Sequence, residues 1–207
     1  SIFKDKPFLL LMLPDDYLNP DKYKGRLRIN PETGKTTQMA IAINYEDRIG
    51  IIIGSSYLGT CKKLIFTVMN YYLVFHNILP LHCSANEGIN KDIALFLGLS
   101  GTGKTTLSTS PDRKLLGDDE HGWSDNGIAN FEYGCYAKLV NLDPIKEPEI
   151  YNACFRKADP INHGAIVENV MTYPDGSFDL FDIRLTENSR GSYPLSFIPN
   201  IKESSVG

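Results

Sequence analysis

The chain has 207 residues, with 21 Lys plus Arg against 25 Asp plus Glu, and its formal charge at pH 7 is -4. This length can bury a substantial core in one domain, or in one domain and part of a second. The basic residues are scattered and form no basic tract, which argues against an extended nucleic-acid surface.

Cysteine usage and the apolar runs favour a cytoplasmic protein that does not cross a membrane. The cysteines at positions 61, 83, 135 and 154 lie far apart without a C-x-x-C pair, which favours reduced thiols. The first apolar run closes at Pro14 and lacks the small-residue pattern of a cleaved signal. The longest apolar region, residues 64–81, contains Asn70, His76, Asn77 and Pro80, which favours a buried helix followed by a strand over a membrane span.

The first part of the chain predicts three strands and a helix. Apolar runs at residues 8–13, 39–43 and 49–53 are typical of strands, and the first reads as an interior strand. Apolar side chains recur at helical spacing from residue 61 to 75, which predicts a helix with most faces buried. A strand at 81–85 follows Pro80.

Further along the chain, strands and helices alternate. The run 93–97 predicts a central strand, residues 104–109 a helix that ends before Pro111, and residues 114–117 another strand. Residues 127–132 and 135–141 are expected to pair as antiparallel strands, and residues 148–156 to form a short helix. Strands at 165–170 and 178–181 are expected to join at Asp175 and Gly176. Mixed elements of this kind predict an α/β fold with mixed sheets.

The segment Gly98-Leu-Ser-Gly-Thr-Gly-Lys-Thr105 fills the phosphate-loop pattern G-x-x-x-x-G-K-[ST]. Its glycines permit backbone conformations in which successive N–H groups turn inward around an anion. Lys104 adds a mobile positive charge, and the Thr105 hydroxyl can join a magnesium ion on the phosphates. Because the segment lies between a predicted strand and a predicted helix, we expect a phosphate-loop mononucleotide-binding core.

Adjacent carboxylates follow the strand at 114–117. Asp118 and Asp119 lie where a second acidic element can reach the metal on a bound nucleotide. Two neighbouring acids repel each other in a partly buried cleft, so a divalent cation is their natural partner. The alternative is a solvated acidic turn.

Three further positions have competing interpretations on local sequence alone. His82 begins a small, apolar segment, where a lone histidine is more often a core residue than a ligand. Lys62 and Lys63 open an apolar helix, where solvated charge is the ordinary reading. Arg190 is either a surface charge or a clamp on a transferring phosphate.

Five segments resemble ATP-dependent phosphoenolpyruvate carboxykinases and occur in that family's order. The resemblance runs over nearly all of residues 45–200, and the loop looks like the ATP-using branch rather than the GTP-using branch. The segments are Gly98-Leu-Ser-Gly-Thr-Gly-Lys-Thr-Thr-Leu-Ser108, Gly117-Asp-Asp-Glu-His-Gly-Trp123, His82-Cys-Ser-Ala-Asn86, Gly134-Cys-Tyr-Ala-Lys138 and Glu187-Asn-Ser-Arg190.

The resemblance implies a reaction and a domain layout. Oxaloacetate would lose carbon dioxide, and its enolate would take the γ-phosphoryl group of ATP, giving phosphoenolpyruvate and ADP, a step of gluconeogenesis. Residues 1–78 would end an N-terminal substrate domain, and residues 79–207 would begin a mononucleotide-binding domain. The implied cofactors are ATP, Mg²⁺ and Mn²⁺, and the implied assembly is a monomer or weak oligomer.

The resemblance also implies roles for individual residues. Lys104 would stabilise charge on the transferring group, and Thr105 would bind magnesium. Lys63, as a neutral amine, would bind a second ion, usually manganese, together with His82 and Asp119. The nucleotide would be contacted by Gly98, Leu99, Ser100, Gly101, Thr102, Gly103, Lys104, Thr105, Thr106, Glu168 and Arg190. Tyr57, Lys63 and Arg190 would contact the substrate, and the catalytic groups would be Lys104, Arg190, Lys63 and His82.

The chain departs from the family at several points. Ser56-Tyr-Leu-Gly-Thr-Cys-Lys-Lys63 replaces the usual Trp-Tyr-x-Gly-Glu-Met-Lys-Lys, so packing beside the substrate must differ. Extra residues precede Glu168, so its assignment depends on Glu168-Asn-Val170. Gly191 replaces a larger residue, which would loosen Arg190.

Family members are more than twice as long, so we expect a fragment. The family arginine that grips the substrate carboxylate and the segments that contact adenine have no counterpart here. Two alternatives stay open: another phosphate-loop small-molecule kinase, which leaves Tyr57, Lys63 and His82 unexplained, and a nucleotide-binding fragment without turnover.

Overall fold

The computed structural model describes residues 3–99, 102–155, 164–202 and 204–206, and the chain divides into two compact units. The first unit, Ser1–His76, contains β1 (Leu9–Leu13), β2 (Ala40–Asn44), β3 (Ile49–Ile53) and α1 (Leu58–Val74). The second unit, Asn77–Gly207, contains β4 (Leu79–Glu87), β5 (Ile93–Leu97), α2 (Lys104–Ser108), β6 (Lys114–Gly117), β7 (Glu120–Ser124), β8 (Gly127–Asn130), β9 (Gly134–Lys138), α3 (Pro148–Phe155), β10 (Ile166–Glu168), β11 (Met171–Thr172), β12 (Phe178–Asp179), β13 (Arg190–Pro194), a 3-10 turn (Leu195–Phe197) and β14 (Ser204–Ser205).

A three-stranded sheet and one helix make up the first unit. The strand order is β1-β3-β2, with β1 parallel and β2 antiparallel to β3. Helix α1 packs on one face through Leu64 and Val68, which form a core with Ile52. Gly50 permits this approach, because a Cβ there would lie 2.8 Å from Leu64 Cδ2. The predicted helix is therefore confirmed, although it begins three residues before position 61. The expectation that most of its faces are buried is wrong, because Leu58, Ile65 and Val74 are exposed.

The interpretation of residues 8–13 as an interior strand is wrong for the described residues. β1 is an edge strand that pairs with β3, and Leu9, Leu11 and Leu13 on the face away from the core are exposed. The continuous apolar run correctly predicted a strand with two apolar faces. It carried no information about how many neighbouring strands would pair with it.

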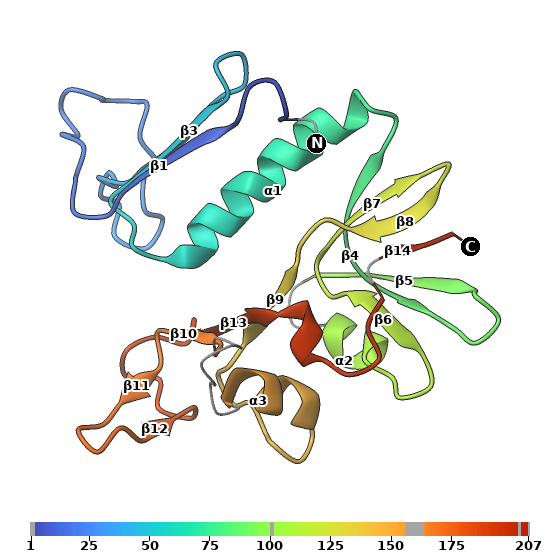
Figure 1. The fold of residues 1–207 in the computed structure, drawn as a ribbon. Coiled ribbons are helices and arrows are strands. Elements are labelled where there is room, and N and C mark those ends of the chain that lie inside the picture. The colour runs from blue at the N-terminus through green and yellow to red at the C-terminus, as the bar shows by residue number, and fades with distance from the viewer. Residues whose placement is uncertain (1–2, 100–101, 156–163, 203, 207) are drawn as a thin grey trace. The chain divides into compact units, whose positions relative to one another are not determined.

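The second unit is built on a larger sheet with the order β14-β8-β7-β4-β5, in which β6 also pairs with β4 (Figure 1). A second sheet has the order β10-β13-β9, and β11 pairs with β12. Helix α3 packs on β13 and contributes Ile150, Ala153 and Cys154 to the main core of this unit. Several sheets combined with helices give the mixed α/β fold that the sequence predicts.

Strand pairing in this unit differs from the sequence-based expectation. The expected pair 127–132 with 135–141 does not form, because β8 pairs with β7 and β14 while β9 pairs with β13. The strand at 93–97 has its predicted bounds as β5, but among the described residues it lies at the end of the sheet order, beside β4, and not at the centre. An apolar run indicates that the side chains of a strand are buried, but not whether the strand has a neighbouring strand on each side.

The segment 164–181 is also rearranged relative to the prediction. The partner of β12 is β11 and not the strand predicted at 165–170, of which Ile166–Glu168 forms β10 and pairs with β13. The predicted turn at Asp175 and Gly176 is present, and Gly176 has a φ of 82°. The helix predicted at 148–156 is α3, whose bounds end at Phe155, and the last predicted residue lies outside the described residues. No helix in the described part of the chain combines the length and apolarity needed to span a bilayer.

Candidate active site

Strand β4 carries the first pair of candidate groups. His82 Nε2 lies 2.5 Å from Asp119 Oδ1, and the Cys83 N–H donates to the Asp119 carbonyl at 2.9 Å. The side chain of His82 is 47% exposed, so the interpretation of this histidine as a core residue is wrong. An imidazole and a carboxylate that meet at an exposed position have the donor chemistry of a transition-metal site.

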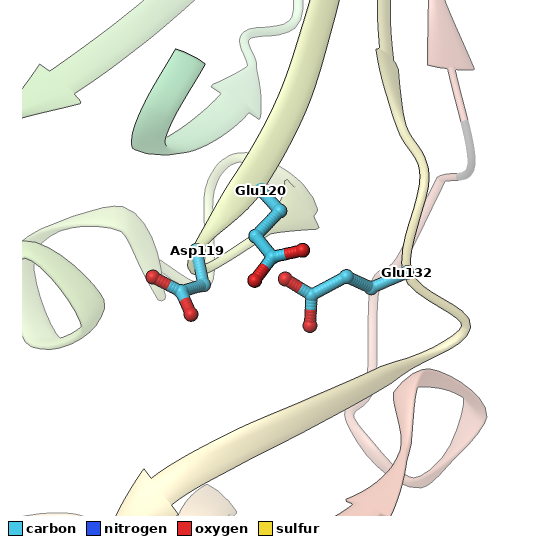
Figure 2. A group of neighbouring side chains, drawn as sticks. All are labelled: Asp119, Glu120 and Glu132. Carbon is cyan, nitrogen blue, oxygen red and sulfur yellow. The ribbon is translucent and has the colours of Figure 1, made fainter. Parts of the chain in front are cut away.

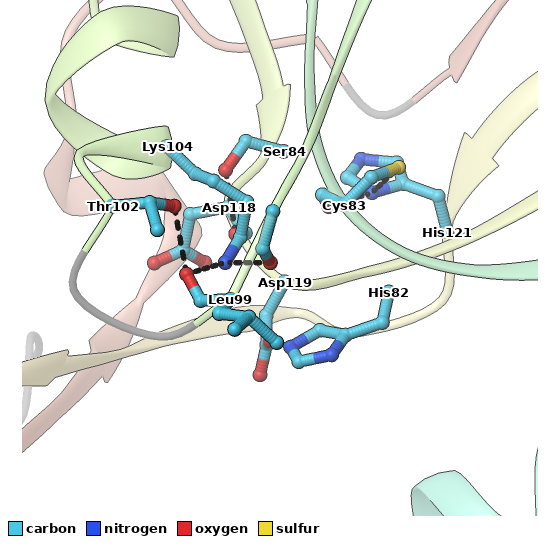
Figure 3. A network of polar contacts seen from close by, with 10 residues as sticks. His82, Cys83, Ser84, Leu99, Thr102, Lys104, Asp118, Asp119 and His121 are labelled. Carbon is cyan, nitrogen blue, oxygen red and sulfur yellow. Dashed lines mark hydrogen bonds and ion pairs between the residues drawn. The ribbon is translucent and has the colours of Figure 1, made fainter.

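The acidic turn is fixed by its backbone. Asp118 and Asp119 join β6 to β7, so they follow a strand as expected, and Ser84 Oγ donates to the Asp118 carbonyl at 2.7 Å (Figure 3). Asp118 is only 7% exposed. Burial, and after it the charge of Asp119, raises the pKa of the Cys83 thiol to about 11. This turn is therefore not the solvated loop of the alternative interpretation.

His121 has a supporting role beside this turn. Its ring is fully buried, and Nδ1 lies 2.9 Å from the Cys83 carbonyl oxygen. Burial lowers the pKa of His121 to about 4, so the ring is neutral at pH 7. Since a carbonyl oxygen only accepts, Nδ1 carries the proton and ties β7 to β4.

Two glutamates that the sequence did not single out lie beside Asp119. Asp119, Glu120 and Glu132 each offer a carboxylate oxygen, and these oxygens lie within 4.8 Å of one another (Figure 2). Glu120 is 3% exposed. Oxygen ligands of this kind suit Mg²⁺, Mn²⁺ or Ca²⁺. Glu120 lies inside the recognised segment 117–123, whereas no local signal connects Glu132 with the turn.

The phosphate-loop segment holds its own lysine. Lys104 Nζ donates to the carbonyls of Gly98 at 2.8 Å and Leu99 at 3.0 Å, and Thr102 Oγ1 donates to Leu99 at 2.7 Å (Figure 3). Gly103 has a φ of 85°, which favours glycine. The Lys104 ammonium group therefore lies beside the loop backbone, and its positive charge favours the binding of an anion there. The candidates Ser100 and Gly101 lie outside the described residues.

Helix α2 begins at Lys104 and places the two threonines of the motif. The Thr105 carbonyl accepts from Ser108 Oγ at 3.1 Å and from Thr109 Oγ1 at 2.8 Å, which closes the short helix. Thr106 Oγ1 donates to Glu147 Oε1 at 3.4 Å. The helix therefore starts where the motif predicts, although it ends one residue earlier, at Ser108.

A second group of candidate residues lies on the sheet β10-β13-β9. Glu168 and Arg190 are direct cross-strand partners, and Tyr136 donates to Glu168 Oε2 at 2.6 Å. The Arg190 guanidinium carbon lies 5.8 Å from the centre of the Tyr136 ring, and its Nε donates to Asn188 Oδ1 at 3.1 Å. Tyr136 lies in the recognised segment 134–138, but the sequence assigned it no role. Here it orients both candidate nucleotide contacts.

The remaining candidates belong to the first unit. Tyr57 precedes α1 and Lys63 lies within it, and both line a cavity of about 510 Å³ with Ile41, Ile43, Thr60 and Thr67. Lys63 Nζ lies 5.1 Å from the centre of the Phe66 ring. This unit therefore brings together the two residues with expected substrate contacts. Their meeting with His82 and Asp119 of the second unit stays a prediction.

Comparison with known proteins places these residues in a family context. The sequence model of a family described as phosphoenolpyruvate carboxykinase matches residues 23–207. The phosphoenolpyruvate carboxykinase (ATP) of Geobacter metallireducens is 52% identical over 176 residues, which are 84% of this chain and 32% of that protein. Phosphoenolpyruvate carboxykinase (ATP) 1 of Moorella thermoacetica is 52% identical over 184 residues, 88% of this chain and 34% of that protein. The chain thus spans about a third of the length of these relatives.

Proposed function

Because the chain belongs to the ATP-dependent phosphoenolpyruvate carboxykinase family, we propose that the complete protein converts oxaloacetate and ATP into phosphoenolpyruvate, carbon dioxide and ADP. The observation that carries the proposal is the contact of His82 of β4 with Asp119 of the turn between β6 and β7, together with a loop that presents Lys104. A generic phosphate-loop kinase requires the lysine and an acidic residue, but has no need of this histidine.

In this proposal the segment Gly98–Thr106 forms a phosphate-loop mononucleotide-binding core. Backbone N–H groups of the loop would hold the triphosphate, and Lys104 would exchange its bonds to the loop carbonyls for bonds to phosphate oxygens. Glu168 and Arg190, paired across β10 and β13, would lie on the nucleotide side. Arg190 would then stabilise negative charge on the γ-phosphate and the developing enolate.

The proposed ligands have the donor chemistry for two divalent cations. Thr105 would contribute a hydroxyl to the nucleotide's Mg²⁺, and Lys63, His82 and Asp119 would bind Mn²⁺ with two nitrogens and a carboxylate. The bound ions would supply positive charge opposite the transferring phosphoryl oxygens. Tyr57 and Lys63, which line one cavity in the first unit, would orient oxaloacetate for loss of its carboxylate.

A nucleotide-binding module without turnover is the second candidate for the 207-residue chain taken alone. It is favoured by one observation, that the chain spans about a third of the length of its relatives. We further propose a cytoplasmic monomer or weak oligomer. The absence of a disulfide among the described cysteines is compatible with a reducing compartment.

Product analysis tests the proposal. The complete protein is incubated with oxaloacetate, ATP and Mn²⁺, and phosphoenolpyruvate, carbon dioxide and ADP are expected in equal amounts. Phosphorylation of another small molecule without carbon dioxide release would point to a different phosphate-loop kinase. Binding of ATP without any product by the complete protein would contradict the enzymatic proposal.

A further inference from the structure

One face of β4 contacts two functional segments, the acidic turn of Asp118 and Asp119 and the helix α2. Alternate side chains of a strand share a face, so His82, Ser84 and Asn86 point the same way. His82 contacts the Asp119 carboxylate at 2.5 Å, Ser84 Oγ donates to the Asp118 carbonyl at 2.7 Å, and Asn86 Nδ2 donates to the Ser108 carbonyl at 2.9 Å. The opposite face carries Ala85, which packs in the core.

Ser84 fixes the backbone immediately before the candidate metal carboxylate. Its side chain is fully buried, and its hydroxyl donates to the main chain of Asp118, not to a side chain that can rotate away. The adjacent Cys83 N–H donates to the Asp119 carbonyl at 2.9 Å. Consecutive residues of β4 therefore hold consecutive carbonyls of the acidic turn, which limits where the Asp119 carboxylate can point.

Asn86 fixes the far end of the phosphate-loop helix. α2 has five residues, too few for stability on its own, and Ser108 is its last residue. Asn86 is fully buried, and both polar atoms of its side-chain amide make hydrogen bonds. Nδ2 donates to the Ser108 carbonyl, and Oδ1 accepts from Arg113 Nε at 2.6 Å. Arg113 is in turn bound to Asp92 at 2.8 Å. The amide therefore cannot turn without breaking a buried contact.

We propose that Ser84 and Asn86 are positioning residues that set the spacing between the Asp119 carboxylate and the helix carrying Lys104 and Thr105. The inference deepens the proposed function and rests on it. Neither residue touches a reacting group, so both act through the main-chain carbonyls that they hold. Ser84 positions the acidic turn that carries the metal ligand Asp119, and Asn86 positions the helix that follows the phosphate loop.

This division makes the two roles separable. Loss of the Ser84 hydroxyl removes one of the two β4 hydrogen bonds that hold the acidic turn, and leaves the contact between Asn86 and α2 in place. Replacement of Asn86 by Asp keeps the volume and the partner of Arg113, but replaces the donor to the Ser108 carbonyl by an oxygen that cannot donate. Each variant therefore disturbs one segment of the site.

The test measures two binding constants in the complete protein and its Ser84→Ala and Asn86→Asp variants. Free Mn²⁺ is followed by electron paramagnetic resonance without nucleotide, and MgATP binding is measured by calorimetry without Mn²⁺. Ser84→Ala is expected to weaken Mn²⁺ binding about ten-fold, the scale of outer-shell changes, while MgATP binding stays within about two-fold. Asn86→Asp is expected to show the reverse pattern.

Ser205→Ala is the matched control. Ser205 is 2% exposed and its hydroxyl donates to Glu87, which lies on the opposite face of β4, so the variant loses a buried hydroxyl of the same kind away from the site. Both constants are expected to stay within about two-fold of the parent protein, because neither segment of the site is released. Arg113→Lys is a second variant for the nucleotide side in case Asn86→Asp does not fold. It removes the Nε donor to Asn86 and is expected to weaken MgATP binding only.

The outcomes separate this inference from the proposed function. A parent protein that forms no phosphoenolpyruvate and binds no Mn²⁺ overturns both. An active parent whose Ser84→Ala variant changes no more than Ser205→Ala overturns the positioning inference alone. So does a pattern in which both site variants weaken both ligands equally, because that pattern reports general loss of structure.

Discussion

Gly191 of β13 faces Cys154 of α3 so closely that a Cβ at position 191 would lie 2.6 Å from the Cys154 sulfur and 3.0 Å from Leu139 Cδ2. Cys154 is 5% exposed and lies in the main core of the second unit. The small residue after Arg190, which the sequence suggested would loosen that arginine, is therefore the residue that lets helix and strand pack. The absence of a side chain at Gly191 leaves the space that the Cys154 side chain occupies.

The first prediction follows from this contact. Gly191→Ala should lower the free energy of unfolding by about 1–3 kcal/mol, because the added methyl group overpacks the core. Cys154→Ala should restore part of the loss in the double variant, so the two changes should be non-additive. Urea denaturation of the parent, both single variants and the double variant measures the coupling. Strictly additive losses would show that residues 191 and 154 do not compete for space.

The second prediction concerns the loop lysine. Lys104→Ala should reduce phosphoenolpyruvate formation by the complete protein by a factor on the order of 10³, because it removes a charge aimed at the transferring group. Lys146→Ala is the control, since the Lys146 side chain is 81% exposed and lies 3.9 Å from Asp143. Initial rates at saturating ATP and oxaloacetate give the comparison. A loss below ten-fold for Lys104→Ala would contradict the proposed role.

Local elements were predictable from the sequence, and their partners were not. The strands at 93–97 and 114–117 have their predicted bounds, and α2 starts at Lys104 as predicted, because apolar runs and glycine patterns act over a few residues. Pairing depends on contacts between distant segments, which no local pattern encodes. For this reason the expected pair 127–132 with 135–141 was wrong.

The candidate site shows the same division. The loop lysine and the acidic turn were recognisable because each has a characteristic local sequence. Glu132 reaches Asp119, and Tyr136 reaches Glu168, only because strands from different parts of the chain come together. His82 was misread locally because nothing beside it shows that its side chain meets the Asp119 carboxylate.

The third prediction concerns acid stability. The hydrogen bonds from Lys202 and then Ser205 hold the pKa of Glu87 below its ordinary value of 4.5. Between the folded-state pKa and 4.5 the unfolded chain therefore binds more protons. The stabilisation is complete above pH 4.5 and is lost as the pH falls through the lowered pKa. Glu87→Gln should therefore lose less stability than the parent between pH 6 and pH 3, as measured by urea midpoints. An identical pH dependence in both proteins would contradict the assignment.

The fourth prediction concerns thiol chemistry. Burial raises the pKa of Cys154 to about 12, and that of Cys83 to about 11 with the charge of Asp119 as the second cause. Since the thiolate is the nucleophile, both residues should resist iodoacetamide at pH 8 in the folded protein and react fully in urea. Peptide mass spectrometry after a timed pulse measures each site. Rapid labelling of Cys154 under native conditions would show that α3 opens from β13.

The metal site that we propose for Lys63, His82 and Asp119 is tested most directly by crystallography. Crystals of the complete protein soaked in Mn²⁺ should give one anomalous peak about 2–2.3 Å from Lys63 Nζ, His82 Nε2 and an Asp119 carboxylate oxygen. The His82→Ala variant should lose most of that peak under the same soak. The proposed site is contradicted if ordered Lys63, His82 and Asp119 side chains point in different directions and the manganese binds elsewhere.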